Sequence, residues 1–178
     1  MAQESDLKRF DAELGPRIVG PEDGPLADLG SIGARMMAWT EETGGGFSLV
    51  EHPMPPRRLA APIHKHSRED EYSFVIEGRM GALLGDDVVY AEVGDLAFKP
   101  RDQWHTFWNA GDTPCEIIEI ISPAGFEKFF RELAEVFAGG PEPDLARFAD
   151  LRARFAVDMD PTSVPGLCER FGVTHPLA

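Results

Sequence analysis

A succession of short β-prone runs occupies the middle of the chain, and this pattern constrains the fold more than any other feature. Between about residues 31 and 122, turns rich in Gly, Pro, Asp and Asn separate the runs IGARMMAW, GFSLVEH, EYSFVIE, RMGALL, VVYAE, DLAFKP, HTFWN and CEIIEII. Many short strands at spacings of about 8–12 residues are typical of a sandwich or a closed barrel. No helical period interrupts them, which argues against an α/β fold. The sequence therefore predicts an all-β domain over residues 31–122.

Different patterns flank this region. Residues 1–30 mix charges with Gly and Pro, and SDLKRFDAEL within them predicts a short helix capped by Ser5. From residue 123 the hydrophobic period becomes helical, so AGFEKFFRELAEVF and PDLARFADLRARFAV predict amphipathic helices and VPGLCERF predicts one short helix. We therefore expect an N-terminal arm at 1–30, a barrel at 31–122 and a helical segment at 123–178 that packs on the barrel.

Charge and composition exclude several classes of partner. The chain has 178 residues and a formal net charge of −14, which disfavours binding to nucleic acids and to anionic membranes. No stretch has the length of a membrane span, and the N-terminus lacks the apolar segment of a secretory signal. Cys115 and Cys168 have neither metal-site nor disulfide spacing, so we expect small buried apolar residues there. These features predict a cytoplasmic protein whose partner is a small molecule.

Histidines and one glutamate provide candidate metal ligands. His64 and His66 lie two residues apart, so on a strand both imidazoles point to the same face. Glu71 opens the following run, and His105 begins HTFWN, which lies beside the first strand if the sheet closes into a barrel. Three neutral imidazoles and one carboxylate suit one divalent transition-metal ion: Fe, Mn, Ni, Zn, Co or Cu.

The spacing around these residues is more specific than the histidine pair alone. His64, His66, Glu71 and Gly78 fit H-x-H-x4-E-x6-G, and Gly94, Pro100, His105 and Asn109 fit G-x5-P-x4-H-x3-N. The two runs resemble the signature of the cupin superfamily. The resemblance implies a jelly-roll β-barrel (a double-stranded β-helix) over about residues 31–122, with His64, His66, Glu71 and His105 in the four ligand positions. The sequence SPAGFEKFFRELAE after the barrel resembles single-domain cupins of the quercetin dioxygenase type.

Two positions depart from the cupin pattern. Arg58 stands six residues before the first histidine of the motif, where the family has Gly, and Asp102 stands two residues after Pro100, where the family usually has Gly. Asp tolerates a left-handed backbone better than most residues, so Asp102 is compatible with the turn. Neither departure changes a candidate ligand.

Alternation along the strands predicts which residues surround the metal. Ser73 and Val75 share the face of Glu71, Phe107 shares the face of His105, and Phe98 and Trp104 flank that strand. The expected pocket residues are Ser73, Val75, Phe98, Trp104 and Phe107. Such a pocket is mostly apolar and suits a small apolar or aromatic substrate, although the same aromatic residues would also simply fill a small barrel.

The resemblance favours a metal-dependent oxidoreductase, dioxygenase-like, in which Glu71 also acts as a general base. Two alternatives stay open: a non-catalytic cupin that binds metal or a small ligand, and an isomerase or lyase acting on a metal-chelating substrate. Alternation favours a solvent-exposed Glu119 over one that faces the pocket, and His175 is either free or closes over a barrel mouth. We also expect a homodimer, because cupins commonly dimerise, with residues 1–30 as an arm across the interface.

Overall fold

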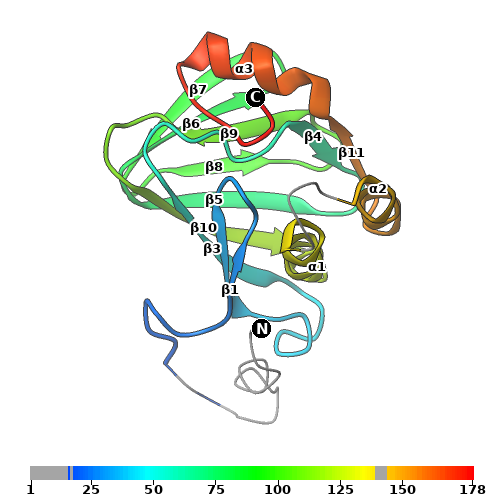
Figure 1. Ribbon diagram of the computed structural model, residues 1–178. Coiled ribbons are helices and arrows are strands. Elements are labelled where there is room, and N and C mark those ends of the chain that lie inside the picture. Colours follow the sequence, from blue (N-terminus) through cyan, green and yellow to red (C-terminus); the bar gives the residue numbers. More distant parts are fainter. Residues whose placement is uncertain (1–15, 17, 139–143) are drawn as a thin grey trace.

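Two antiparallel β-sheets face each other in a computed structural model of the chain, which describes residues 16, 18–138 and 144–178 (Figure 1). The first sheet has the order β1 (Leu26–Asp28), β2 (Gly33–Ala38), β3 (Ser48–Met54), β10 (Cys115–Ser122), β5 (Asp70–Glu77) and β8 (Leu96–Lys99). The second has the order β11 (Val157–Asp160), β4 (Ile63–His66), β9 (His105–Asn109), β6 (Arg79–Leu84) and β7 (Asp87–Glu92). This arrangement confirms the predicted all-β jelly-roll barrel with helices that follow it.

Strand β10 shows how the sequence positions inward and outward side chains. Its residues alternate strictly between buried and partly buried, so Cys115, Ile117, Glu119 and Ile121 face the interior. Period-2 alternation in an antiparallel sheet produces this pattern when one face covers a core. Glu119 is only 1% exposed, so the expectation that it points to solvent is wrong.

The turns that shape the barrel depend on a few residues. Gly78 has a φ of 72°, and a Cβ added there would lie 2.4 Å from the carbonyl oxygen of Pro114, so only glycine fits between β5 and β6. Asp102 has a φ of 64° in the turn after β8, which agrees with the expected left-handed conformation. Asn109 donates side-chain hydrogen bonds to the carbonyls of Met54, Pro55 and Thr113, and thereby ties three chain segments together.

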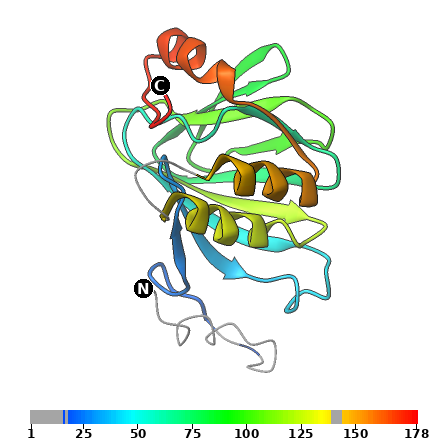
Figure 2. The same cartoon turned by 45° about the vertical axis from the view of Figure 1, so that its right-hand side comes forward.

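Helix α1 (Glu127–Ala138) and helix α2 (Leu145–Arg154) lie side by side against the barrel, as Figure 2 shows. In α1, Phe129, Leu133 and Val136 are buried in a cluster with Val50 and Ile121 of the first sheet. Burial of each large side chain contributes about 1.5–3 kcal/mol, so these contacts hold the helix in place. Both helices agree with the helical periods predicted after residue 123.

Part of the C-terminal segment is a strand rather than a helix. The second helical run ends near Phe155, because Ala156 takes a left-handed φ of 55°, and Val157–Asp160 then forms β11. In β11, Val157 pairs with His66 and Met159 pairs with His64, so β11 covers the outer edge of β4. A 3₁₀ turn (Pro161–Ser163) and the short helix α3 (Val164–Phe171) follow.

The N-terminal expectations are only partly covered by the structure. The predicted helix in SDLKRFDAEL lies outside the described residues. Within the predicted arm, β1 pairs with β2 and so extends the first sheet. In the part of the chain that the structure describes, no helix is long and apolar enough to cross a membrane.

Candidate metal centre

Three histidines meet inside the barrel on neighbouring strands of the second sheet. His64 and His66 alternate inward on β4, while Lys65 between them pairs with Asp158 of β11. His105 is the first residue of β9 and is the Cα partner of His64 in the β4–β9 pair. All three imidazoles are buried, with exposures between 1% and 7%. The predicted same-face geometry of His64 and His66 is therefore observed.

The imidazole nitrogens converge closely enough to hold one ion. One ring nitrogen of each histidine lies within 4.8 Å of those of the other two, and the ring centroids of His64 and His105 are 4.4 Å apart. Tetrahedral or octahedral ligands at about 2.0–2.1 Å from a metal have mutual separations of about 3–4 Å, which small rotations of these rings achieve. His64, His66 and His105 are thus positioned to bind a metal.

Backbone carbonyls orient two of the rings. The Nδ1 of His64 lies 2.8 Å from the carbonyl oxygen of Pro62, and the Nδ1 of His105 lies 2.9 Å from that of Gln103. A carbonyl oxygen only accepts, so each Nδ1 carries the proton, and in the neutral ring Nε2 has a free lone pair. This is the arrangement in which a metal-ligating histidine is held by a hydrogen bond from its other nitrogen.

Burial keeps these imidazoles in the form that binds metal. Desolvation lowers the pKa of His64 well below its usual value, and the neighbouring His105 and His66 lower it further. Desolvation also lowers the pKa of His66 to about 4, although Glu71 acts in the opposite direction. Both rings are neutral at pH 7, and a metal does not have to displace protons from them.

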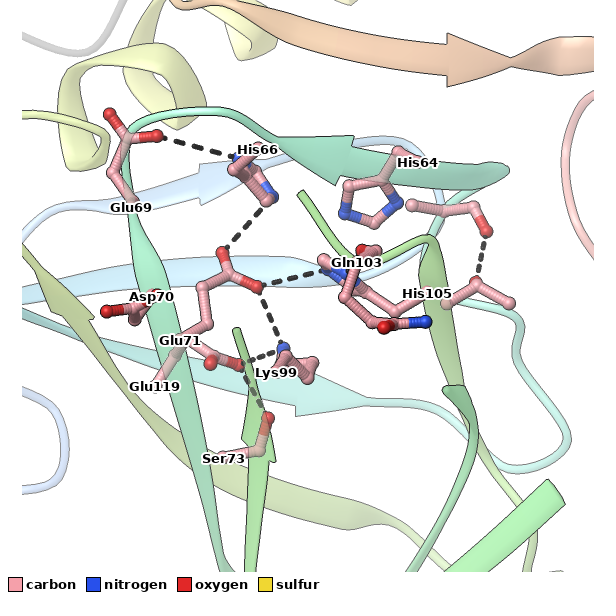
Figure 3. Close-up of polar contacts among 12 residues, drawn as sticks. His64, His66, Glu69, Asp70, Glu71, Ser73, Lys99, Gln103, His105 and Glu119 are labelled. Atoms are coloured by element: carbon pink, nitrogen blue, oxygen red, sulfur yellow. Dashed lines mark hydrogen bonds and ion pairs between the residues drawn. The ribbon is translucent and has the colours of Figure 1, made fainter. Parts of the chain in front are cut away.

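Glu71 approaches the histidines from the opposite sheet, on β5 (Figure 3). Its Oε1 lies 3.4 Å from the Nε2 of His66, and its Oε2 lies 3.3 Å from the Nε2 of His105. Within the described residues, both of these buried Nε2 atoms lack a hydrogen-bond partner. A cation placed between these two Nε2 atoms and the carboxylate would be bound by all three groups. The donor set thus fits a divalent transition metal.

A buried lysine fixes the carboxylate of Glu71. Lys99 of β8 is 1% exposed, and its Nζ lies 3.0 Å from Glu71 Oε2 and 3.0 Å from Glu119 Oε2 (Figure 3). Burial alone would raise the pKa of Glu71, but Lys99, His66 and His105 together hold that pKa well below the usual range. Burial would likewise lower the pKa of Lys99, but Glu119 and Glu71 raise it. Glu71 is therefore a carboxylate, and Lys99 is a cation, next to the three histidines.

Sequence reasoning missed Lys99 and Glu119 as members of this cluster. In LAFK the apolar Leu96 and Phe98 occupy the outer face of β8, and the charged Lys99 is the residue that turns inward. The usual assumption that apolar residues point inward therefore fails on this strand. The sequence signal that could have found Lys99 is its position directly before Pro100 of the motif. In the sheet, Lys99 is the Cα partner of Glu71.

A cavity of about 90 Å³ adjoins the three-histidine cluster. It is lined by His64, Glu71, Phe107 and Glu119 from the barrel, by His52, by aromatic side chains of the helices, and by His175 and Leu177 near the C-terminus. His52 is buried, donates from Nδ1 to the carbonyl of Gly33 at 2.9 Å, and has its pKa lowered to about 4 by burial. The cavity is therefore mostly apolar with a few polar groups, a character that suits a small ligand.

The expected pocket residues are distributed unevenly around this cavity. Phe107 lines it, whereas Ser73 and Val75 point inward and are fully buried in the barrel wall. Phe98 and Trp104 do not line it: Phe98 is 47% exposed on the outer face of β8, and Trp104 is 39% exposed beside Lys65. Alternation explains Phe98, because its neighbour Lys99 occupies the inward position.

Aromatic residues at the start of α1 cover the cluster. The ring of Phe126 meets that of His66 edge-to-face with centroids 4.4 Å apart, and the ring of Phe130 meets that of His52 at 5.1 Å. Edge-to-face pairs of this kind are favourable and specific in geometry. The start of the C-terminal segment thus contacts His66 and His52 in addition to packing on the barrel.

Comparison with known proteins agrees with this architecture. Residues 51–121 match the Cupin domain family. The match begins in β3, ends in β10, and includes all three histidines and Glu71. No curated protein matches the chain.

Solved structures with the same fold include KdgF from Halomonas sp., with a TM-score of 0.56 and 17% identity over 64% of this chain and 98% of that one. A predicted oxalate decarboxylase from Thermotoga maritima has a TM-score of 0.57 and 17% identity over 60% and 99% of the two chains. Streptomyces PAC13, crystallised with uridine, has a TM-score of 0.53 and 16% identity over 65% and 88%. At these identities the likeness extends to the fold alone. Together with the domain match, it supports the cupin superfamily for the barrel.

Proposed function

We propose that this protein binds one divalent transition-metal ion through His64, His66, Glu71 and His105, and that it is a metal-dependent enzyme acting on a small ligand. The proposal rests on the buried Nε2 atoms of His66 and His105, which face the carboxylate of Glu71 and have no hydrogen-bond partner among the described residues. A buried polar atom without a hydrogen-bond partner costs about 1–3 kcal/mol, and a bound cation removes this cost.

When bound, such an ion supplies Lewis acidity, or a route for electrons if it is redox-active, together with open coordination positions for a substrate. The protein supplies the remainder of the site. His64 and Glu71 line both the metal cluster and the cavity, so a ligand in the cavity is next to the metal. Phe107 and Phe126 exclude water around the cluster, which strengthens electrostatic interactions there.

For Glu71, we propose the role of metal ligand before that of general base. Lys99 holds the pKa of Glu71 well below its usual range, and a carboxylate with such a pKa is a weak proton acceptor near pH 7. Its two oxygens face His66 and His105, so either oxygen is suitable as a ligand. A Glu71→Gln variant separates the two roles, because loss of a ligand weakens metal affinity, whereas loss of a base lowers kcat with metal affinity kept.

For the reaction, we propose oxidative, dioxygenase-like chemistry on a small apolar substrate. Support comes from the apolar cavity beside the metal cluster and from the superfamily resemblance of the barrel. The cavity of about 90 Å³ is smaller than the roughly 150 Å³ that accommodates benzene, which favours compact substrates over large aromatic ones. Lyase chemistry is the second candidate, because a predicted oxalate decarboxylase shares the fold and oxalate is compact.

Elemental analysis of protein purified without added metal is the first test, and oxygen uptake by the Fe, Mn, Ni and Cu forms with small enols, diketones and carboxylic acids is the second. We expect about one equivalent of a transition metal and oxygen consumption with at least one substrate. Metal binding without oxygen uptake, but with carbon dioxide release, would replace the oxidative proposal with the lyase one. Metal binding with a tightly held, unchanged ligand would identify a binding protein, and absence of metal binding would refute the whole proposal.

We also propose that the protein is a homodimer that associates through the outer face of the first sheet. Phe74, Ile76, Leu96 and Phe98 are 38–55% exposed there, and Phe74 pairs with Leu96 across β5 and β8. Contiguous apolar surface of this kind usually marks an interface. Light scattering should show a dimer for the wild type and a monomer for Leu96→Lys/Phe98→Lys. Tyr90→Lys, at a 51% exposed position on β7, is the matched control and should stay dimeric.

A further inference from the structure

Glu119 occupies an unusual place for a carboxylate. It lies in the middle of β10, surrounded in sequence by isoleucines, and its side chain is 1% exposed inside the barrel. It lines the cavity beside the metal cluster. A buried carboxyl group is expensive unless it is paired and hydrogen-bonded, so its presence requires an explanation.

Only one of its two oxygens has partners in the described structure. Oε2 accepts hydrogen bonds from Lys99 Nζ at 3.0 Å and from Ser73 Oγ at 2.8 Å (Figure 3). Oε1 is buried and has no hydrogen-bond partner among the residues that the structure describes. Lys99 and Ser73 therefore satisfy one oxygen of the carboxylate. The other oxygen, Oε1, can bind a molecule that enters the cavity.

The sheet register places Glu119 at a fixed distance from the metal cluster. Glu119 pairs with Ser73, and Ser73 is two residues from Glu71 along β5. The Oε2 atoms of Glu119 and Glu71 each lie 3.0 Å from Lys99 Nζ, so the two oxygens are no more than about 6 Å apart, which one small molecule can span. Much of the remaining cavity wall is apolar, with Phe107 from the barrel and Phe126, Phe129 and Phe130 from the C-terminal segment.

We infer that Glu119 is a specificity-determining residue whose Oε1 hydrogen-bonds a hydroxyl group of the ligand, while the other end of that ligand occupies the metal. A hydroxyl group fits because it both donates and accepts, so it can pair with either protonation state of the carboxyl group. The ligand class is therefore a short molecule with a metal-binding group at one end, an aliphatic body and a hydroxyl group at the other end. This inference rests on the proposed metal site.

Two isosteric acids test the inference: 3-hydroxypropanoate and butanoate, which differ only in a terminal hydroxyl or methyl group. Calorimetric titration of the zinc-loaded protein with each acid gives a ratio of dissociation constants. We expect the hydroxy acid to bind about tenfold or more tightly, because a hydrogen bond to a charged group contributes about that factor. In Glu119→Leu the preference should disappear, with butanoate affinity kept or improved.

The controls separate this inference from the metal proposal. Glu116→Leu changes a carboxylate on the outward face of the same strand and should keep the wild-type preference. If Glu119→Leu does not fold, Glu119→Gln still offers an oxygen to Lys99 and Ser73 and should lower the preference by about threefold or more, since the charge is lost. Zinc binding together with equal affinities of the two acids, or with no binding of the hydroxy acid, overturns the inference for Glu119 alone. Loss of zinc binding in the wild type would instead remove the metal site on which the inference rests.

Discussion

The two walls of the barrel interior achieve burial of polar groups in opposite ways. The second sheet contributes His64, His66 and His105, which are buried and have ring nitrogens within 4.8 Å of one another. The first sheet contributes Glu71, Lys99 and Glu119, which form a chain of contacts at 3.0 Å with the lysine in the middle. Among the described residues, the histidine wall has no cation of its own, whereas the carboxylate wall contains Lys99. Glu71 links the two walls, because it contacts Lys99 at 3.0 Å and faces His66 and His105 at 3.3–3.4 Å.

The largest effect is expected from removal of Lys99, the internal cation of the carboxylate wall. Lys99→Met leaves Glu71 and Glu119 buried without their shared partner, and we expect the free energy of unfolding of the metal-free protein to fall by about 3–5 kcal/mol. Urea denaturation followed by circular dichroism measures this loss. Lys65→Met is the control, because Lys65 is 28% exposed and its ion-pair partner Asp158 is 70% exposed. An equal loss in both variants would contradict the internal balance described for this wall.

The histidine wall should respond in metal affinity rather than in stability. His66→Ala removes a nitrogen from the cluster, and we expect zinc affinity to fall by more than about a hundredfold, since even residues that only orient ligands contribute 10- to 100-fold. Competition with a chromogenic chelator measures the affinity. His175→Ala is the matched control, as His175 lines the cavity but lies outside the three-histidine cluster, and it should bind zinc like the wild type.

Acid should act with opposite signs on His52 and Glu119, two buried groups of the first sheet. Burial lowers the pKa of His52 to about 4. The unfolded chain therefore takes up a proton below pH 6.5 before the folded protein does, and stability falls by about 2 kcal/mol between pH 7 and pH 5. Burial raises the pKa of Glu119 to about 7, so the folded protein takes up this proton before the unfolded chain does. Protonation of Glu119 therefore increases the free energy of unfolding by about 2 kcal/mol between pH 7 and pH 5.

Variants separate these two contributions to the pH dependence. Relative to the wild type, His52→Phe should lose less stability between pH 7 and pH 5, and Glu119→Gln should lose more. Denaturation curves of the three metal-free proteins at both pH values provide the comparison. Parallel pH responses of all three would contradict the assigned pKa directions.

The smallest effect is expected at the surface of the histidine wall. Lys65 and Asp158 join β4 to β11 at 3.4 Å, with Asp158 70% exposed. Exposed ion pairs contribute about 0–1 kcal/mol, so Asp158→Asn should change the free energy of unfolding by less than about 1 kcal/mol. A loss comparable to that of Lys99→Met would mean that the edge contact, rather than burial, determines the stability of this sheet.

Much of the barrel could be predicted from the sequence because its strands are short and are bounded by turn residues. The histidine cluster was also predictable, since His64 and His66 share a strand face and His105 has a fixed spacing from Gly94 and Pro100. These are local properties, and strand alternation alone determines the direction in which these side chains point.

The polar half of the interior was not predictable by the same reasoning. Alternation cannot tell which face of β8 or β10 is inward when both faces carry apolar residues, so Phe98 was expected inside and Glu119 outside. The pairing of Lys99 with two carboxylates depends on three strands meeting, which no local pattern encodes. The strand β11 was missed because a left-handed Ala156 ends the helical run within one residue.

The position of β11 affects how the protein forms during synthesis. Strand β4 carries two of the histidines, yet its outer edge is paired only by residues 157–160, near the end of the described chain. A ribosome releases β4 long before β11, so the nascent protein exposes an unpaired strand edge with its metal-binding side chains already present. Completion of the sheet around β4 therefore waits until residues 157–160 have been synthesised, which makes this strand an unsuitable place for truncation.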